Sequence, residues 1–351
     1  MNEQMTSLER TLAAINHQEP DRVPLFLLLS LYGAKELGMT PKDYFAEAQN
    51  IVAAQLRMKE KYRNDCIYTF FYAAIEVEAF GGEVIFVEDG PPIAGSPFIT
   101  SYQDIARMEV PDIQATSCLA RVLDATRQLK QRVANTAPII GVVMSPYSLP
   151  IMQMGFEKYL ELLYFHPDHF HCLMKKNQAF CLAWANAQIA AGATAICYFN
   201  PLASPNMIEK ETYLATGYPI DCATLPQIMG PTATHLASGI ALPLLDEIAN
   251  TGTKVVGVGH QEDLSGLKHA SAGRLCVLGN LNGIEMVKWS REQVHEEVRK
   301  TIRAAGKGGG LIVSDGHGEI PLQVPEQVLL EISEAVRLYG TYPLDRIQCN
   351  G

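Results

Sequence analysis

Residues 309–321 of the chain read GGLIVSDGHGEIP, and the fold can be worked out from this stretch outward. The apolar run 311–313 predicts a short buried strand, because it is too short and too closely flanked by glycine for a helix. Asp315, His317 and Glu319 follow the end of that strand. Loops after strand carboxyl ends carry the chemistry in α/β folds, since they vary while the sheet stays constant. Taken alone, the stretch is equally compatible with a polar turn and a solvated histidine.

Similar apolar runs recur along the whole chain and alternate with helical patterns. Helices are predicted at 40–63, 167–191 and 291–305, among others, and strands at 25–29, 66–71, 139–144, 195–199, 233–236, 254–258, 275–278 and 311–313. About eight strand–helix repeats with helix-length crossovers predict a parallel sheet closed into a (β/α)₈ TIM barrel.

The predicted domain organisation is a single TIM-barrel domain over residues 1–351, with the barrel itself at about 20–340. Residues 7–16 predict an amphipathic helix, so that about 1–20 form a helical N-terminal extension. The Gly- and Pro-rich segment 84–98 predicts a small excursion beside the main body. Two ordinary domains are the alternative at this length, but no low-complexity linker divides the chain.

Bulk composition restricts the class of protein. The 48% apolar and 19% charged residues are typical of a soluble protein with a substantial core. A net charge of −10 argues against a broad nucleic-acid surface. The eight cysteines include no CxxC pair, which argues against a disulfide framework or zinc ribbon and favours a reduced, cytoplasmic location. We expect neither a signal peptide nor a membrane span, and the sequence leaves a homo-oligomer open without setting the oligomeric state.

Polar side chains follow most of the predicted strands, where a barrel would place its active site. We take Asp315, Glu76 and Asn200 as candidate catalytic residues. The candidate substrate-binding residues are Tyr32, Glu78, Tyr147, Asn280 and Asn282.

Three histidines stand among the last four strand ends, namely His235, His260 and His317. Neutral imidazole is a frequent zinc ligand, and three protein ligands with one open position are how catalytic zinc is held. The pattern therefore predicts a zinc site, with Asp315, Glu262 or Glu76 orienting an imidazole. The alternative is that these histidines are separate polar side chains lining a substrate pocket.

Several segments resemble the uroporphyrinogen decarboxylase superfamily, and more closely its corrinoid-dependent methyltransferase branch. The resemblance rests on residues 20–24, 75–83, 190–193, 277–282 and 310–321. True decarboxylases carry Arg-Gln-Ala-Gly-Arg-Tyr after the first strand, whereas residues 28–35 here read LLSLYGAK. Without those arginines the carboxylates of uroporphyrinogen lose their bidentate partners. We therefore expect no decarboxylation of uroporphyrinogen.

The resemblance implies a methyltransferase that moves a methyl group between a small methylated substrate and the cobalt of a corrinoid. A separate corrinoid protein would carry that cofactor and dock at the barrel mouth. The branch typically holds zinc through a His-x-Cys, an acidic residue and a final Cys. Here Ala237 replaces the first Cys, His260 stands at the acidic place and His317 replaces the last Cys.

These substitutions have two interpretations: the metal is lost, or the site has become a three-histidine site. The second predicts a stronger Lewis acid, suited to demethylating an O-methyl compound. The other functions left open are methyl transfer to a thiol or other acceptor, metal-free decarboxylation of a small acid by Asp315 or Glu76, and a barrel that only binds a ligand or partner.

Overall fold

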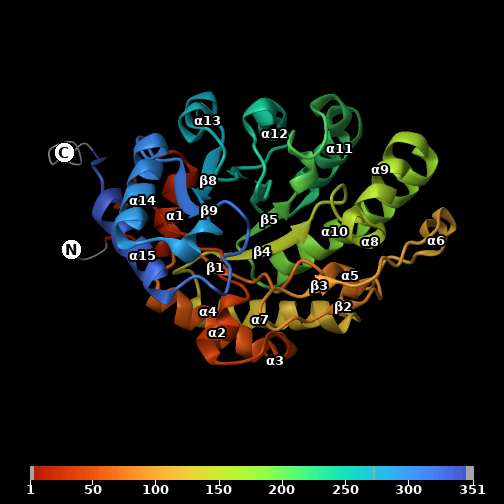
Figure 1. The fold of residues 1–351 in the computed structure, drawn as a ribbon, viewed down its shortest axis with the longest axis horizontal. Coiled ribbons are helices and arrows are strands. Elements are labelled where there is room, and N and C mark those ends of the chain that lie inside the picture. The colour runs from red at the N-terminus through yellow and green to blue at the C-terminus, as the bar shows by residue number, and fades with distance from the viewer. Residues whose placement is uncertain (1–3, 272, 345–351) are drawn as a thin grey trace.

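In a computed structural model that describes residues 4–271 and 273–344, the strands form a curled parallel sheet surrounded by helices (Figure 1). Seven strands pair in the order β1-β4-β5-β6-β7-β8-β9. They are β1 (Ile67–Tyr68), β4 (Ile139–Met144), β5 (Ala195–Phe199), β6 (Thr232–His235), β7 (Val255–Gly257), β8 (Cys276–Leu281) and β9 (Leu311–Asp315).

The segment after Pro24 closes the sheet between β9 and β1. On one side the Phe26 N–H donates to the Val313 carbonyl at 2.8 Å, and on the other the Asp65 N–H donates to the Leu25 carbonyl at 2.8 Å. Only Leu25 forms a regular parallel bridge. The (β/α)₈ barrel is thus confirmed, but the strand predicted at 25–29 is wrong as regular structure. The reason lies in the Asn64 side chain, which accepts the Leu27 N–H and donates to the Leu27 carbonyl. These backbone groups therefore do not pair with a neighbouring strand.

Helices follow most strands and cover the outside of the sheet. They are α1 (Ser7–Ile15), α2 (Tyr32–Leu37), α3 (Pro41–Ala46), α4 (Ala48–Lys61), α5 (Ile75–Ala79), α6 (Tyr102–Arg107), α7 (Ser117–Val133), α8 (Pro150–Met154), α9 (Phe156–Phe165), α10 (Pro167–Ala191), α11 (Lys210–Thr224), α12 (Leu245–Asn250), α13 (Leu264–Ser271), α14 (Arg291–Ala305) and α15 (Glu326–Gly340). The excursion predicted at 84–98 contains the antiparallel pair β2 (Val84–Ile85) and β3 (Ile93–Ala94). No helix in the described ranges is long and apolar enough to span a bilayer.

Two predicted elements differ in extent. The helix predicted at 40–63 breaks at Glu47, which is extended at φ −131° and ψ 136°. The break frees the Phe45 and Ala46 carbonyls, which accept from the Arg121 guanidinium at 3.0 and 3.4 Å. The strand predicted at 66–71 ends after Tyr68. Beyond it, the Ser30 hydroxyl donates to the carbonyls of residues 70 and 71 and turns the chain towards the barrel mouth.

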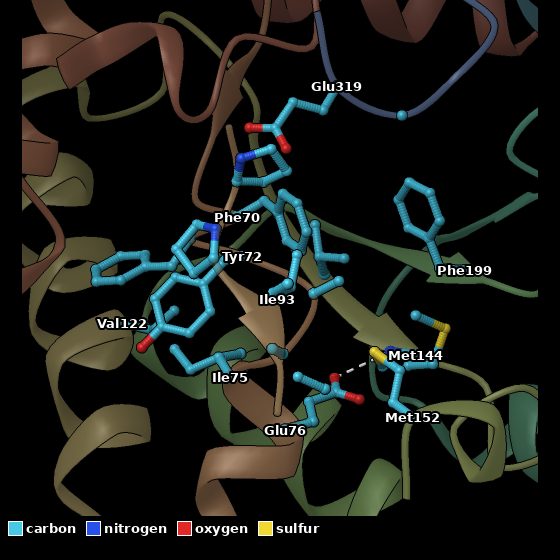
Figure 2. A pocket seen from close by; sticks show the side chains of 18 of the residues that line it. Phe70, Tyr72, Ile75, Glu76, Ile93, Val122, Met144, Met152, Phe199 and Glu319 are labelled. Carbon is cyan, nitrogen blue, oxygen red and sulfur yellow. Dashed lines mark hydrogen bonds between the residues drawn. The ribbon is translucent and has the colours of Figure 1, made fainter. Parts of the chain in front are cut away.

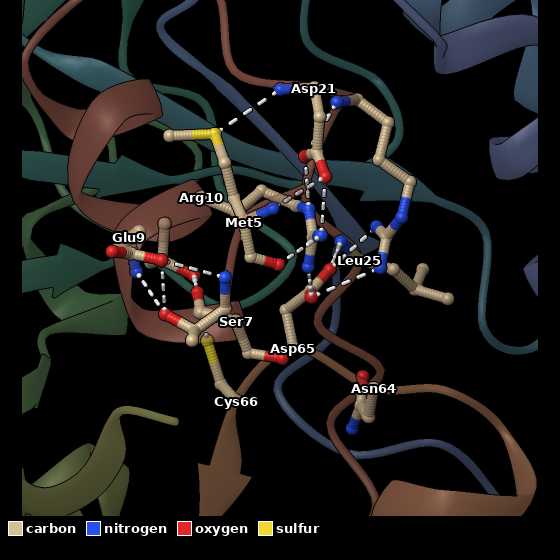
Figure 3. A network of polar contacts seen from close by, with 12 residues as sticks. Met5, Ser7, Glu9, Arg10, Asp21, Leu25, Asn64, Asp65 and Cys66 are labelled. Carbon is tan, nitrogen blue, oxygen red and sulfur yellow. Dashed lines mark hydrogen bonds and ion pairs between the residues drawn. The ribbon is translucent and has the colours of Figure 1, made fainter. Parts of the chain in front are cut away.

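At the opposite end of the barrel, a buried ion-pair network attaches α1 to the strands (Figure 3). Arg10 donates to Asp21 at 2.6 Å and to Asp65 at 2.7 Å, and Arg22 donates to Asp65 at 2.7 Å. The second Asp65 oxygen also accepts the Leu25 N–H at 2.8 Å. These contacts tie the N-terminal helix to the segment that closes the barrel.

Candidate active site

A cavity of about 400 Å³ lies at the carboxyl ends of the strands. Residues 69–76 after β1 and 317–319 after β9 form two of its walls. The β2–β3 excursion contributes residues 91–94, and the remaining walls come from β4, β5, α7, α8 and α10. Figure 2 shows Glu76 and Glu319 at opposite ends of this space, with Phe70 and Ile93 between them.

The walls of the cavity are largely apolar and aromatic. Phe70 and Phe199 stack with ring centroids 6.2 Å apart and an interplanar angle of 15°. The other apolar lining side chains include Tyr72, Ile75, Val122, Val142, Met144 and Met152. The described lining contains no lysine or arginine. Such a space favours an uncharged ligand, because burying an ion without a partner costs several kcal/mol.

Glu76 is the buried carboxyl group at one end of the cavity. Its position on α5 lets Oε1 accept the Met144 N–H at 2.9 Å, while Oε2 has no hydrogen-bond partner. Burial raises the pKa of Glu76 to about 8, although the Met144 N–H and the nearby Trp184 indole oppose the shift. The side chain is therefore mainly a protonated carboxylic acid at neutral pH. Because Oε1 already accepts, the acid hydrogen belongs on Oε2 and is free to donate.

Trp184 lies on α10 and also lines the cavity. Its side chain is 1% exposed, and its indole N–H has no hydrogen-bond partner. The indole is close enough to Glu76 to favour the ionised carboxylate, but the two groups do not meet the geometry of a hydrogen bond. Further along α10, the Gln188 side chain donates to the Val142 carbonyl and accepts its N–H, which holds this helix against β4.

Glu319 forms the opposite end of the cavity. Its carboxylate accepts the Leu31 N–H at 2.8 Å, and burial raises its pKa to about 7. Nearby Asp315 accepts the N–H groups of His317 and Gly318 at 3.0 and 3.1 Å. Burial raises the pKa of Asp315 to about 6 against these hydrogen bonds. Asp315 thus organises the turn that presents His317 and Glu319 to the cavity.

The three candidate metal ligands lie in one region behind this turn. The rings of His260 and His317 have centroids 5.4 Å apart, and His235 stacks on Phe199 at 4.7 Å. Gly257 leaves room for the His235 ring, since a Cβ there would lie 2.4 Å from it. Burial lowers the pKa of His235 to about 3 and also lowers that of His317. Both imidazoles are therefore neutral near pH 7.

Comparison with known proteins identifies the family. The family model for uroporphyrinogen decarboxylase (URO-D) matches residues 6–339. The chain belongs to the uroporphyrinogen decarboxylase family.

Its curated relatives include the uroporphyrinogen decarboxylases of Methylococcus capsulatus and Idiomarina loihiensis. The first is 30% identical over 284 residues, covering 78% of this chain and 79% of the relative. The second is 25% identical over 356 residues, covering 95% of this chain and 96% of the relative. A methyltransferase from Methanosarcina mazei superposes with a TM-score of 0.85 at 18% identity, covering 96% of this chain and 99% of that one. A B12-independent methionine synthase from Shewanella sp. W3-18-1 superposes with a TM-score of 0.54 at 11% identity, covering 83% of this chain and 88% of that one. At these identities the two solved structures indicate the shared fold.

Within this URO-D family member, the histidine cluster does not fit a zinc ion as it is arranged. His317 Nε2 donates to Asn282 Oδ1 at 3.2 Å, because that oxygen already accepts the N–H groups of Ile284 and Glu285. The Nδ1 lone pair of His317 faces the Ser238 hydroxyl at 2.6 Å.

His235 uses its lone pair in the same way. Its Nδ1 accepts the Ala237 N–H at 2.9 Å, so the hydrogen lies on the buried and unpartnered Nε2. The lone pairs that would bind zinc in His235 and His317 are therefore already used. Across residues 4–271 and 273–344, no three His, Cys, Asp or Glu side chains converge as a metal-binding group.

The structure separates the other predicted site residues from the cavity. Asn200 lies in a buried network, donating to Asp221 and accepting from the hydroxyls of Ser145 and Ser148. The Tyr32 hydroxyl donates to the Val324 carbonyl. Three more lie outside the lining and are held by protein partners: Tyr147 by Thr216, Glu78 by the lining residue Tyr72, and Asn280 by the carbonyls of 259, 260 and 262. Of the residues predicted for the site, Glu76 and His317 line the cavity.

Sequence reasoning missed the aromatic lining and Trp184. Phe199 ends β5 and Phe70 follows the end of β1, both as ordinary apolar residues, and Trp184 lies on a helix among other buried side chains. A tryptophan on a core-facing helix surface was the available signal, since its N–H needs an acceptor when buried. Nothing in the one-dimensional pattern distinguishes a satisfied indole from an unpartnered one.

Proposed function

We propose that this protein transfers a methyl group from a small, uncharged O-methyl compound to the cobalt of a corrinoid carried by a separate protein. The observation that carries the proposal is Glu76, a buried carboxylic acid with an unpartnered oxygen in an apolar cavity. Within the URO-D family, the departure at residues 28–35 supports the methyltransferase branch over the decarboxylases. The corrinoid protein would dock over the carboxyl ends of the strands, where the cavity lies.

Glu76 would supply the proton that makes the substrate oxygen a leaving group. The reduced corrinoid, when docked, supplies the electron pair that accepts the methyl group. As the methyl–oxygen bond breaks, its electron pair stays on oxygen, which takes the Oε2 hydrogen of Glu76 and leaves as an alcohol or phenol. Glu76 then remains as a carboxylate and regains a proton from water before the next turnover. General acids of this kind contribute about 10²–10⁴-fold in rate.

Decarboxylation is the second candidate, and the charge of the cavity weighs against it. The described lining offers no cationic side chain to a substrate carboxylate, and Glu319, with a pKa of about 7, is partly anionic at neutral pH. His317, whose pKa is lowered, adds no positive charge. Transfer to a thiol is also less favoured, because it relies on zinc to hold the thiolate and the histidine arrangement does not fit that ion.

The test is anaerobic turnover with free cob(I)alamin in place of the corrinoid protein. A panel of methyl ethers is incubated with the enzyme, and methylcobalamin is followed by its absorbance. We expect methylcobalamin and demethylated product in equal amounts. Glu76→Gln should lower the rate about 10²–10⁴-fold, because an amide is a far weaker proton donor. The exposed Glu109→Gln serves as the matched control and should leave the rate unchanged.

Three results would overturn this function. They are conversion of uroporphyrinogen to coproporphyrinogen, release of CO₂ from small acids without methylcobalamin formation, and wild-type turnover in Glu76→Gln.

A further inference from the structure

Two buried polar side chains that line the cavity each have an atom without a hydrogen-bond partner. Glu76 is 3% exposed and Trp184 is 1% exposed, and both line the cavity close to each other. The Oε2 atom of Glu76 and the indole nitrogen of Trp184 have no partner. Most buried polar groups in folded proteins are satisfied, so an adjacent pair of exceptions needs an explanation.

We infer that Glu76 and Trp184 form a two-donor subsite that receives one acceptor oxygen of an uncharged, single-ring ligand. This inference deepens the proposed function, because that oxygen would be the one that carries the methyl group. It also makes Trp184 a substrate-binding residue, which the sequence did not predict.

The orientation of Glu76 carries the first step of the argument. Its Oε1 is fixed by the Met144 N–H at 2.9 Å, so the acid hydrogen on Oε2 is directed elsewhere. The Trp184 indole can only donate, and a protonated Oε2 that donates needs an acceptor of its own. The two groups lie close to each other without a hydrogen bond between them. An ether or hydroxyl oxygen placed against both would accept from both.

The rest of the cavity selects the body of the ligand. Its volume of about 400 Å³ falls within the range of small-molecule sites. The stacked pair Phe70 and Phe199, together with Tyr72, presents ring faces and edges that favour an aromatic ligand. A quaternary ammonium has no lone pair for the two donors. A carboxylate would be buried without a cation, because the described lining contains no lysine or arginine.

The chain carries its own reporter for this subsite. It has two tryptophans, Trp184 and Trp289, so Trp289→Phe leaves Trp184 as the single tryptophan, whose emission can be excited selectively over that of tyrosine. Anisole and ethylbenzene form a matched pair of ligands, because a methylene replaces the ether oxygen at nearly constant shape. Binding is measured without cobalamin, so it does not depend on turnover.

In Trp289→Phe, anisole should change the Trp184 emission saturably, and ethylbenzene should bind about tenfold or more weakly because it leaves two buried donors unsatisfied. Benzoate and phenyltrimethylammonium should bind more weakly than anisole. In Trp184→Phe, with Trp289 intact, the affinities for anisole and ethylbenzene should lie within about threefold of each other. Calorimetry measures both affinities. Glu76→Leu removes the other donor and should narrow the difference in affinity between anisole and ethylbenzene in the same way. This variant provides the test if Trp184→Phe does not fold.

Equal binding of anisole and ethylbenzene would overturn the inference, and so would tighter binding of benzoate or full oxygen preference in both variants. Oxygen-selective binding without any methylcobalamin formation would overturn the proposed function alone. Methylcobalamin formation from ethers that bind no better than their hydrocarbon counterparts would overturn the subsite alone.

Discussion

The two ends of the barrel bury polar groups in opposite ways. At the end where the strands begin, Asp65 is 1% exposed and accepts from Arg10, Arg22 and the Leu25 N–H (Figure 3). At the end where they finish, Glu76 is as deeply buried but has one oxygen without a partner (Figure 2). Equal burial therefore has different meanings. A satisfied buried charge holds the fold together, whereas an unsatisfied buried acid is available to a ligand.

The largest change in stability should come from disrupting the ion-pair network around Asp65. Asp65→Asn leaves two buried guanidinium groups short of an anion and should lower the free energy of unfolding by about 3–5 kcal/mol. Urea denaturation followed by circular dichroism measures this loss. The control is Asp246→Asn, which breaks an exposed pair with Arg274 and should cost less than about 1 kcal/mol. A loss below about 1 kcal/mol in Asp65→Asn would contradict a structural role for this network.

Glu76 should behave in the opposite way to Asp65, because its negative charge destabilises the fold. Burial raises its pKa from the ordinary 4.5 to about 8, so between these values the native state holds a proton that the unfolded chain has lost. The unfolded state then binds fewer protons, and the free energy of unfolding falls as pH rises through this window. The stability contributed by protonated Glu76 is complete below about pH 4.5 and lost as pH rises towards 8.

The comparison of wild type with Glu76→Gln isolates this effect from Asp315 and Glu319, whose pKa values are also raised. Wild type should lose up to about 1.4 kcal/mol per pH unit relative to the variant in the middle of the window. Urea denaturation between pH 5 and 9 measures the difference. Parallel stability profiles for the two proteins would show that Glu76 ionises normally.

The smallest effect is expected at the histidine cluster, because the lone pairs of His235 and His317 already accept hydrogen bonds and are not available to a metal. Addition of zinc or of a chelator should shift the melting temperature by less than about 1 °C, since only a ligand bound to the native state stabilises it. Elemental analysis of the purified protein should find far less than one zinc per chain. Stoichiometric zinc that disappears in His317→Ala would contradict the hydrogen-bond assignment.

Most of the architecture followed from local patterns. Strand β4 (Ile139–Met144) and helices α10 (Pro167–Ala191) and α14 (Arg291–Ala305) match the predicted bounds. A continuous apolar run, a proline at the first helical turn and glycine or charge at the ends mark these elements locally. The closing segment near Leu25 was placed correctly, but its irregular pairing could not be predicted, because it depends on the side chain of Asn64.

The candidate site was less accessible to sequence reasoning because its chemistry depends on tertiary hydrogen bonds. Glu76 was predicted for the site because it follows a predicted strand. The tautomers of His235 and His317 depend on Ala237, Ser238 and Asn282, whose contacts no spacing rule reveals. The importance of Trp184 likewise rests on a missing partner, which only the folded structure makes visible.

The most direct test of the account is the protonation state of Glu76 in the folded protein. Infrared spectroscopy detects the carbonyl stretch of a protonated carboxylic acid, and the difference between wild type and Glu76→Gln isolates this one group. The account predicts an acid band at pH 6 and pH 7 that is absent from Glu76→Gln and disappears with a midpoint near pH 8. If wild type and variant show the same acid bands at pH 6, Glu76 is already ionised, and the proposed proton donor does not exist.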